Sequence, residues 1–214
     1  MACGTCQKCE DGCTSIRDFA VRVVPHAAGA PMNVIEDNVQ MVLQDFAKRT
    51  GIIERVICIE TQAGVCRYEL DVPCDELIHR INKVTDNDCY CPDPLRDRPH
   101  FDQCIGDKYY FEPKCTLYLA PTPQRDGQKI YVEVTTIPSR AVCEVDDRFF
   151  EYHSQAIVDG TIARLASMSQ SEWSNAGVAA RKDREYEDQL YAASCLEKRQ
   201  FSGGPMRARG RGWL

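Results

Sequence analysis

The chain has 214 residues, of which 43% are hydrophobic and 27% charged, a composition typical of one globular domain or of a core with one inserted subdomain. No apolar run approaches the roughly 18 residues that a membrane span needs, and residues 1–13 lack the basic and apolar regions of a signal peptide, so neither membrane insertion nor export by that route is expected. The net charge of −6 is unevenly distributed: the residues from Lys198 onward hold five basic side chains and no acidic one, which leaves 21 of the 26 basic and all 32 acidic side chains, a net charge of −11, before them. This acidic body gives no indication of a nucleic-acid surface, whereas the basic tail is expected to contact something negative.

Residues 1–32 contain a cysteine cluster, a short apolar stretch and a segment rich in Pro, Ala and Gly, and we expect them to form an arm without regular structure. Four cysteines at the start have the spacing C-x2-C-x2-C-x3-C, the run seen in bacterial ferredoxins: Cys3, Cys6, Cys9 and Cys13. Thiolates this close could bind a 4Fe–4S cluster or a tetrahedral zinc ion. These four residues are therefore a candidate metal site.

Other features of the cysteines weigh against a ferredoxin. Thr14 follows the run where a proline usually stands, and no second run of matching spacing is present. The chain holds 13 cysteines, an odd number that argues against a secreted disulfide framework. We therefore expect no cofactor, with the 4Fe–4S cluster or zinc as the alternative. Thiols that are free, oxidised or in contact with a neighbour stay open.

Residues 33–51 predict an amphipathic core helix. One apolar stripe recurs at i, i+4, i+7 and i+11: Ile35, Val39, Val42 and Phe46. Asn33 is expected to cap this helix and Gly51 to end it.

Residues 52–138 predict an antiparallel β subdomain. Strands are expected at residues 56–59, 65–72, 77–84, 109–111, 116–119 and 129–134. Cys58 and Cys66 flank a turn at residues 62–64 and could face each other on adjacent strands; the other interpretation is two small buried apolar residues. Residues 86–107 are long and polar and predict a loop that forms a contact surface.

Residues 139–200 predict two long core helices, over about residues 146–168 and 174–199. Small residues in the first would let a neighbouring helix approach closely: Ala156, Gly160 and Ala163. The whole pattern predicts an α+β fold, with a helical core of three main helices, an inserted antiparallel β subdomain and extended termini.

Residues 201–214 form a basic arm in this prediction. Its candidate contact residues, with the end of the preceding helix, are Lys198, Arg199, Arg207, Arg209, Arg211, Trp213 and Leu214. An RNA-binding segment of the RGG kind is one interpretation, but three arginines without a flanking repeat support it weakly. An arm that docks on a partner through Trp213 and Leu214 better explains the large apolar pair.

No catalytic motif is found. The G-x-S-x-G elbow, the H-E-x-x-H pair and the Walker loop are absent from the sequence, and its four histidines are scattered. His153 lies on a predicted helix face, where packing is a commoner role than catalysis. We assign no catalytic residues and expect a protein that is not an enzyme.

Three segments carry a resemblance to one known family. Residues 39–73 combine a helix that ends in a Phe…Arg-Thr step with a strand, an Ala-Gly turn and a Tyr-x-Leu…Pro strand. Residues 116–139 contain a Leu…Pro-x-Pro hairpin and a Val-x-Val strand. Residues 149–193 hold two long helices, with Asp-Gly inside the first and a Trp-Ser-Asn junction between them. In order and spacing, over about residues 33–201, the chain resembles the head-to-tail adaptor (neck, or tail tubular) proteins of short-tailed bacteriophages.

The resemblance implies a structural virion protein, assembled in the host cytoplasm. It implies a homo-oligomeric ring of about twelve copies that joins the portal protein to a tail tube or nozzle protein. DNA would pass through this dodecamer without sequence-specific binding, and no membrane would be involved. The C-terminal arm would reach into the portal. The cysteine-rich N-terminus departs from the family and keeps the metal-binding alternative open.

Overall fold

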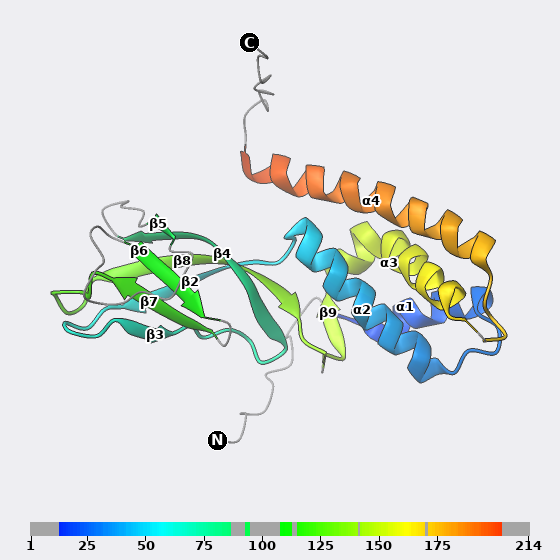
Figure 1. Cartoon of the computed structure of the whole chain (residues 1–214), viewed down its shortest axis with the longest axis horizontal. Coiled ribbons are helices and arrows are strands. Elements are labelled where there is room, and N and C mark those ends of the chain that lie inside the picture. The colour runs from blue at the N-terminus through cyan, green and yellow to red at the C-terminus, as the bar shows by residue number, and fades with distance from the viewer. Residues whose placement is uncertain are drawn as a thin grey trace, which may run out of the picture.

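The computed structural model describes residues 13–86, 93–94, 108–112, 115–140, 142–169 and 171–202. Figure 1 shows an elongated molecule with its helices at one end and most of its strands at the other. The predicted α+β class is confirmed. In chain order the elements are β1 (Cys13–Ser15), α1 (Ile16–Val23), η1 (Val24–His26), α2 (Met32–Thr50), β2 (Glu54–Glu60), β3 (Arg67–Glu69), β4 (Glu76–Asp86), β5 (Asp93–Pro94), β6 (Lys108–Glu112), β7 (Thr116–Ala120), β8 (Lys129–Pro138), β9 (Glu144–Asp146), α3 (Asp147–Ser167) and α4 (Ala176–Ser202).

The prediction of an irregular arm over residues 1–32 is wrong from Cys13 onward. The short strand β1 pairs antiparallel with β9, and the helix α1 follows it. Ser15 caps α1, because its side chain accepts a hydrogen bond from the backbone N–H of Arg17 at 3.2 Å. The apolar stretch of the sequence is one buried face of this helix, at i, i+3, i+4 and i+7: Ile16, Phe19, Ala20 and Val23. Residues 1–12 lie outside the described residues.

The helix predicted over residues 33–51 is confirmed as α2. Its N-cap is Pro31 instead of Asn33, so the helix begins before the predicted cap. Gly51 ends it in the left-handed conformation, with φ of 75°, and donates its N–H to the carbonyl of Ala47 at 2.9 Å.

The two long helices of residues 139–200 are also confirmed. Asp146 caps α3 by accepting a hydrogen bond from the N–H of Arg148 at 2.9 Å. Asn175 caps α4 in the same way, accepting from Gly177 and Val178 at 3.1 Å each. The helix α4 continues to Ser202, beyond the predicted end at Arg199 and into the predicted arm.

The β half contains two sheets, with strand orders β2-β8-β4 and β3-β7-β6-β5. Their pairs are antiparallel except for the two-residue parallel pair between β5 and β6. The run predicted over residues 65–72 is a strand only at β3, although Tyr68 and Leu70 are buried on one face as its period of two requires. Within the predicted loop 86–107, residues 93–94 form β5; residues 87–92 and 95–107 lie outside the described residues.

Each half has its own apolar core. The helical core gathers α1, α2, α3 and α4, and its large side chains include Phe19, Phe46, Phe149, Leu43 and Leu165. The β core lies between the two sheets and includes Tyr68, Leu70, Tyr109, Leu117 and Val132. Both cores are single contiguous clusters of buried residues.

The chain enters the β half after α2 and returns to the helical half through β8. The two crossings are neighbours, because the N–H of Thr136 donates to the carbonyl of Ile53 at 3.0 Å. Within the described residues, no helix combines the length and the apolar composition that crossing a bilayer requires.

Candidate interaction surface

The helices α3 and α4 pack closely at Gly160. A Cβ atom at this position would lie 2.9 Å from Cδ2 of Tyr186 on α4 and 2.9 Å from Cγ1 of Val42 on α2. Both distances are shorter than van der Waals contact, so only glycine fits without a shift of its neighbours. The sequence predicted close packing here, and the structure confirms it.

A buried carboxylate joins α3 to α4 beside this contact. Asp159 is 2% exposed, and Oδ1 accepts hydrogen bonds at 2.8 Å from both Lys182 Nζ and Gln155 Nε2. Its second oxygen accepts from Gln189 Nε2 at 2.9 Å. The hydrogen bond to Asp159, followed by one of 2.6 Å to Glu185, raises the pKa of Lys182. This four-residue set, Gln155, Asp159, Lys182 and Gln189, is here called the Asp159 network.

Polar contacts also join α2 to α4. Arg49 donates two hydrogen bonds to the carboxylate of Glu187, at 2.6 and 2.5 Å, and these bonds raise the pKa of Arg49 and lower that of Glu187. The hydroxyl of Tyr186 donates to Asp45 at 2.9 Å; burial, and then the charge of Asp45, raise the pKa of Tyr186. The helix α4 is thus attached to both of its neighbours.

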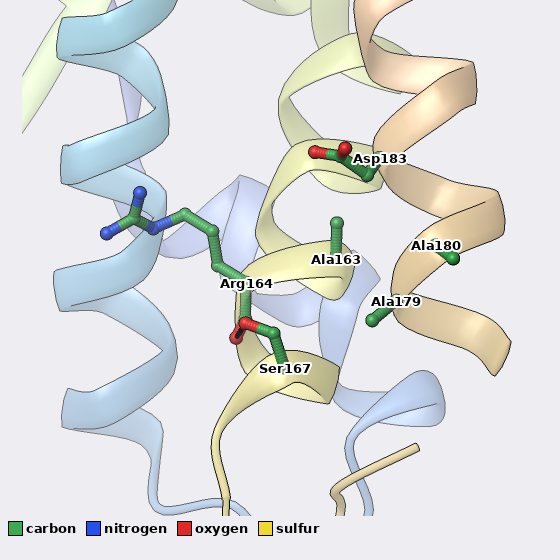
Figure 2. A pocket seen from close by; sticks show the side chains of 6 residues that line it. All are labelled: Ala163, Arg164, Ser167, Ala179, Ala180 and Asp183. Atoms are coloured by element: carbon green, nitrogen blue, oxygen red, sulfur yellow. Dashed lines mark hydrogen bonds between the residues drawn. The ribbon is translucent and has the colours of Figure 1, made fainter. Parts of the chain in front are cut away.

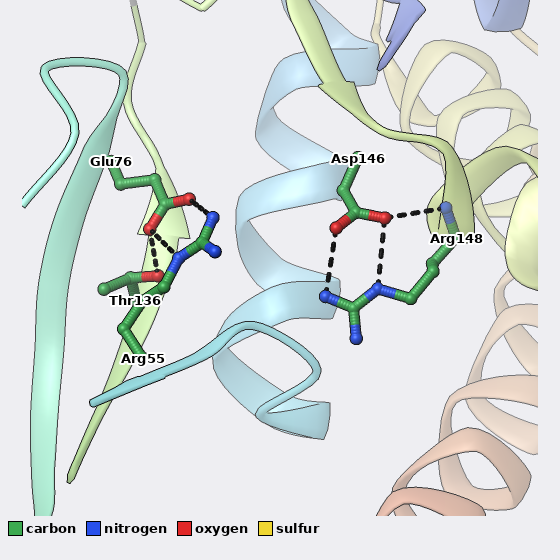
Figure 3. Close-up of polar contacts among 5 residues, drawn as sticks. All are labelled: Arg55, Glu76, Thr136, Asp146 and Arg148. Atoms are coloured by element: carbon green, nitrogen blue, oxygen red, sulfur yellow. Dashed lines mark hydrogen bonds and ion pairs between the residues drawn. The ribbon is translucent and has the colours of Figure 1, made fainter. Parts of the chain in front are cut away.

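Two ion pairs lie where the strands meet the helices (Figure 3). Arg55 on β2 donates to Glu76 on β4 at 2.5 and 3.2 Å, and the buried hydroxyl of Thr136 on β8 donates to the same carboxylate at 2.6 Å. Asp146 accepts from the guanidinium of Arg148 at 3.0 Å. Burial acts to raise the pKa of Asp146, but the hydrogen bonds from Arg148 outweigh it and the pKa is lowered. The first pair joins the outer strands β2 and β4 across β8, and the second stabilises the start of α3.

A hollow of about 310 Å³ lies between the last turns of α3 and the first turns of α4; Figure 2 shows the side chains that line it. Alanines are three of its six lining residues: Ala163, Ala179 and Ala180. The side chain of Arg164 points away from the other labelled residues toward α2, where Nη2 lies 3.1 Å from Met41 Sδ. The polar groups around this hollow do not converge on one point, so it offers no arrangement for a specific ligand.

A second hollow lies between the same two helices, toward the C-terminal end of α4. It encloses about 370 Å³, and we call it the α3–α4 groove; its lining residues are Tyr152, His153, Ala156, Gln189, Ala192, Ala193 and Leu196. Tyr152 is 72% exposed and Leu196 47% exposed. Tyr191, next to the groove in sequence, is 73% exposed. The groove is therefore part of an apolar surface without a partner among the described residues.

His153 lies in the wall of this groove and packs on the core. Its ring centroid is 5.0 Å from that of Phe46. Burial, and then the charge of Arg148, lower the pKa of His153 below its ordinary value of 6.5. The observed contact is the packing role that the sequence predicted.

We expect the stability of the subunit to fall as the pH drops from about 6.5 to 5, because the unfolded chain then binds protons that the folded His153 binds only at lower pH. Replacing His153 with glutamine is expected to flatten this part of the profile, which thermal unfolding at a series of pH values measures. His79 also has a lowered pKa, so its contribution to the pH dependence of stability remains in the variant. The pKa values of Asp146 and Glu187 are also lowered, so protonation of these two carboxylates removes stability in a separate, more acidic range. An unchanged slope above pH 5 in the variant would contradict this role of His153.

The predicted metal site can be located only in part. Cys13 is the first residue of β1 and lies opposite Asp146 of β9, whereas Cys3, Cys6 and Cys9 lie outside the described residues. In the described part of the chain, no three His, Cys, Asp or Glu side chains are grouped so as to hold a metal ion. The cysteine run thus ends where the described fold begins.

The predicted docking arm is likewise located in part. Lys198 and Arg199 lie in the last turns of α4. The remaining arm residues lie outside the described residues: Arg207, Arg209, Arg211, Trp213 and Leu214.

The predictions for Cys58 and Cys66 are wrong. Cys58 lies on β2, which pairs with β8, whereas Cys66 precedes β3, which pairs with β7 in the other sheet. The chain changes sheet after the turn, so the two cysteines are not on adjacent strands. Cys58 is exposed and Cys66 half-buried, so they are not a buried apolar pair either.

The sequence interpretation also missed the Asp159 network and the α3–α4 groove. Gln155 and Asp159 are spaced i, i+4 on one helix, which is a local signal for a hydrogen bond. Their contacts with Lys182 and Gln189 depend on how two helices pack, for which the sequence contains no local pattern. No protein-family model matches the chain, and a search of curated proteins finds no significant match.

Proposed function

We propose that this chain is a structural virion protein, a head-to-tail adaptor subunit that forms a ring between the portal and the tail of a short-tailed bacteriophage. The observation that carries the proposal is the apolar surface of the α3–α4 groove, with the exposed Tyr152 and Leu196, at the end of α4 from which the basic arm continues. Contiguous apolar surface on a folded chain is typical of a protein-binding face.

In this proposal the helical half is the rigid docking body. Its three longer helices α2, α3 and α4 are held together at Gly160 and by the Asp159 network. Exposed aromatic side chains beside this rigid contact between α3 and α4 suit a binding face, because tyrosine and tryptophan provide large contact areas with few rotatable bonds. The helical half and the arm bind the portal protein.

The β half contacts the tail tube or nozzle protein, or the neighbouring copies in a ring of about twelve. Val56 on β2 is 67% exposed and Leu77 on β4 is 48% exposed, on the two outer strands of the sheet β2-β8-β4. Outer strands with exposed apolar side chains are available for pairing with another chain. DNA passes through the ring without sequence-specific contacts, and the net charge of −11 before the arm suits such passage.

The second candidate is an iron–sulfur or zinc protein built on Cys3, Cys6, Cys9 and Cys13. Their C-x2-C-x2-C-x3-C spacing favours it. Metal analysis and visible absorption of the purified chain decide the matter. A chain that holds neither iron nor zinc, and that tolerates replacement of all four cysteines by serine, excludes this candidate.

Deleting residues 207–214 is expected to weaken binding to the portal ring by at least about 30-fold, since loss of one apolar anchor of the hot-spot kind costs about 2 kcal/mol. The deletion begins after the described end of α4, so the fold of the subunit should be kept. Sedimentation of the purified protein, alone and mixed with a portal ring, measures the complex, and circular dichroism checks the fold.

Two full-length variants separate the parts of the arm. Replacing Arg207, Arg209 and Arg211 with lysine keeps the charge, so the complex should persist. Replacing Trp213 and Leu214 with alanine removes the anchors and should reproduce the deletion. If the truncated protein still joins the portal and completes particles, the arm is not the docking element.

A further inference from the structure

We propose that, in the free subunit, the α3–α4 groove binds Trp213 and Leu214 of the same chain. This inference goes beyond the proposed function, because it concerns where the arm lies before any partner is present. It rests on the shape and exposure of the groove, on the reach of the chain after Ser202, and on the charges around the groove.

The groove suits an apolar occupant of this size. It encloses about 370 Å³, and three alanines line it: Ala156 on α3, and Ala192 and Ala193 on α4. Tyr152 and Leu196 flank it and are largely exposed. An aromatic ring placed between these two side chains would remove apolar surface from water on both sides, which is the main driving force for such a contact.

The chain that follows α4 is long enough to return to the groove. Leu196 and Gln189 lie about 9 and 20 Å before Ser202 along the helix axis, at a rise of 1.5 Å per residue. The twelve residues 203–214 begin with Gly-Gly-Pro, which readily reverses the chain direction. The nine residues after the proline span up to about 30 Å when extended. Trp213 can therefore reach any part of the groove.

An acidic side chain beside the groove complements the charge of the arm. Asp188 lies one helical turn before the groove residue Ala192, and its carboxylate is exposed. Asp188 has no ion-pair partner among the residues that the structure describes. The arm alternates arginine with small residues over 207–212, so in an extended form its arginines share one side and its small residues permit close approach to α4.

Attachment to the same chain favours this occupant over a second copy. A short connection of this kind gives the arm an effective concentration in the millimolar range at its own groove, far above the concentration of free subunits in a typical preparation. A partner that takes the arm must therefore displace it from the groove. Docking within one chain would also cover the apolar surface while the subunit is alone.

The test uses the tryptophan fluorescence of the full-length chain. The contribution of Trp213 is the difference between the natural chain and its Trp213→Phe variant, because the other tryptophan, Trp173, is common to both. We expect this difference spectrum to lie at shorter wavelength than that of a solvent-exposed tryptophan, and to be protected from acrylamide quenching. Ala192→Arg, an exposed change inside the groove, should abolish both effects by filling the groove and repelling the arginines.

Ala180→Arg is the matched control, since it makes the same change at an exposed alanine of α4 in the other hollow. It should leave the signal of Trp213 unchanged. A Trp213 that is exposed in the free subunit overturns the proposal, as does a protected Trp213 that Ala192→Arg does not affect. Protection that disappears on dilution shows binding to a second copy and overturns the same-chain proposal. All these readouts are made without a portal, so they fail or succeed independently of the adaptor function.

Discussion

Replacing Lys182 with methionine is expected to destabilise the folded subunit by about 3 kcal/mol, the lower end of the range for removing one partner of a buried ion pair. The lower end applies because the side chain of Lys182 is 17% exposed and water can partly replace it. The side chain of Asp159 is only 3% exposed, so its charge would remain buried with two amide donors alone. Chemical denaturation with circular dichroism measures the loss.

A double variant separates the charge from the packing. Asp159→Asn removes the charge that Lys182 neutralises, so Asp159→Asn with Lys182→Met should lose much less than the sum of the two single changes. The raised pKa of Lys182 adds a second signature. Its stabilising effect is complete below the ordinary lysine pKa of 10.5 and is lost as the pH rises through the higher folded value. Strictly additive single effects would show that the two side chains do not interact.

The variant Gly160→Val is expected to lose about 3 kcal/mol or more, the upper end of the range for overpacking a core. The new Cβ would lie 2.9 Å from the side chains of both Tyr186 and Val42, and these contacts involve atoms close to the backbone instead of the ends of flexible side chains. The gain in helix propensity over glycine, below about 1 kcal/mol, cannot offset this clash. Thermal unfolding monitored by circular dichroism measures the effect.

Gly177→Ala is the matched control, because a Cβ there meets only Asn175 Oδ1 at 3.5 Å, which is ordinary contact. It should leave the melting temperature unchanged or raise it slightly. Gly160→Ala with Val42→Ala should be more stable than the sum of the single losses predicts, since the smaller side chain makes room for the new methyl group. A Gly160→Val protein with the natural melting temperature would contradict the close approach of the helices.

Much of the fold could be predicted because its signals are local. The helix α2 shows a clear apolar stripe and ends at Gly51, and most strands of the β half have turn residues between them. The helix α1 was missed because it has only eight residues, too few for its apolar period to stand out beside a cysteine cluster. The pairing of β2 with β8 was missed because it joins residues far apart in sequence, and the two cysteines were misplaced with it.

The candidate site could be predicted only where one residue carried the signal. Gly160 stands out in a helix because glycine costs helix propensity, so close packing was its natural explanation. The α3–α4 groove has no such marker, since alanines and tyrosines are common in helices and only the packing of α3 on α4 leaves Tyr152 and Leu196 exposed. Asp188, beside the groove, was indistinguishable in the sequence from other surface carboxylates.

The neighbouring crossings at Ile53 and Thr136 have a consequence for how such a protein can change over time. Because the chain leaves and re-enters the helical half at adjacent points, the whole β half is an insertion whose two ends could be joined by a few residues. Insertions or deletions within the β half, or its replacement by another domain, would leave the packing around Gly160 unchanged. One end of the molecule can therefore diversify to meet new neighbours while the other keeps an old contact.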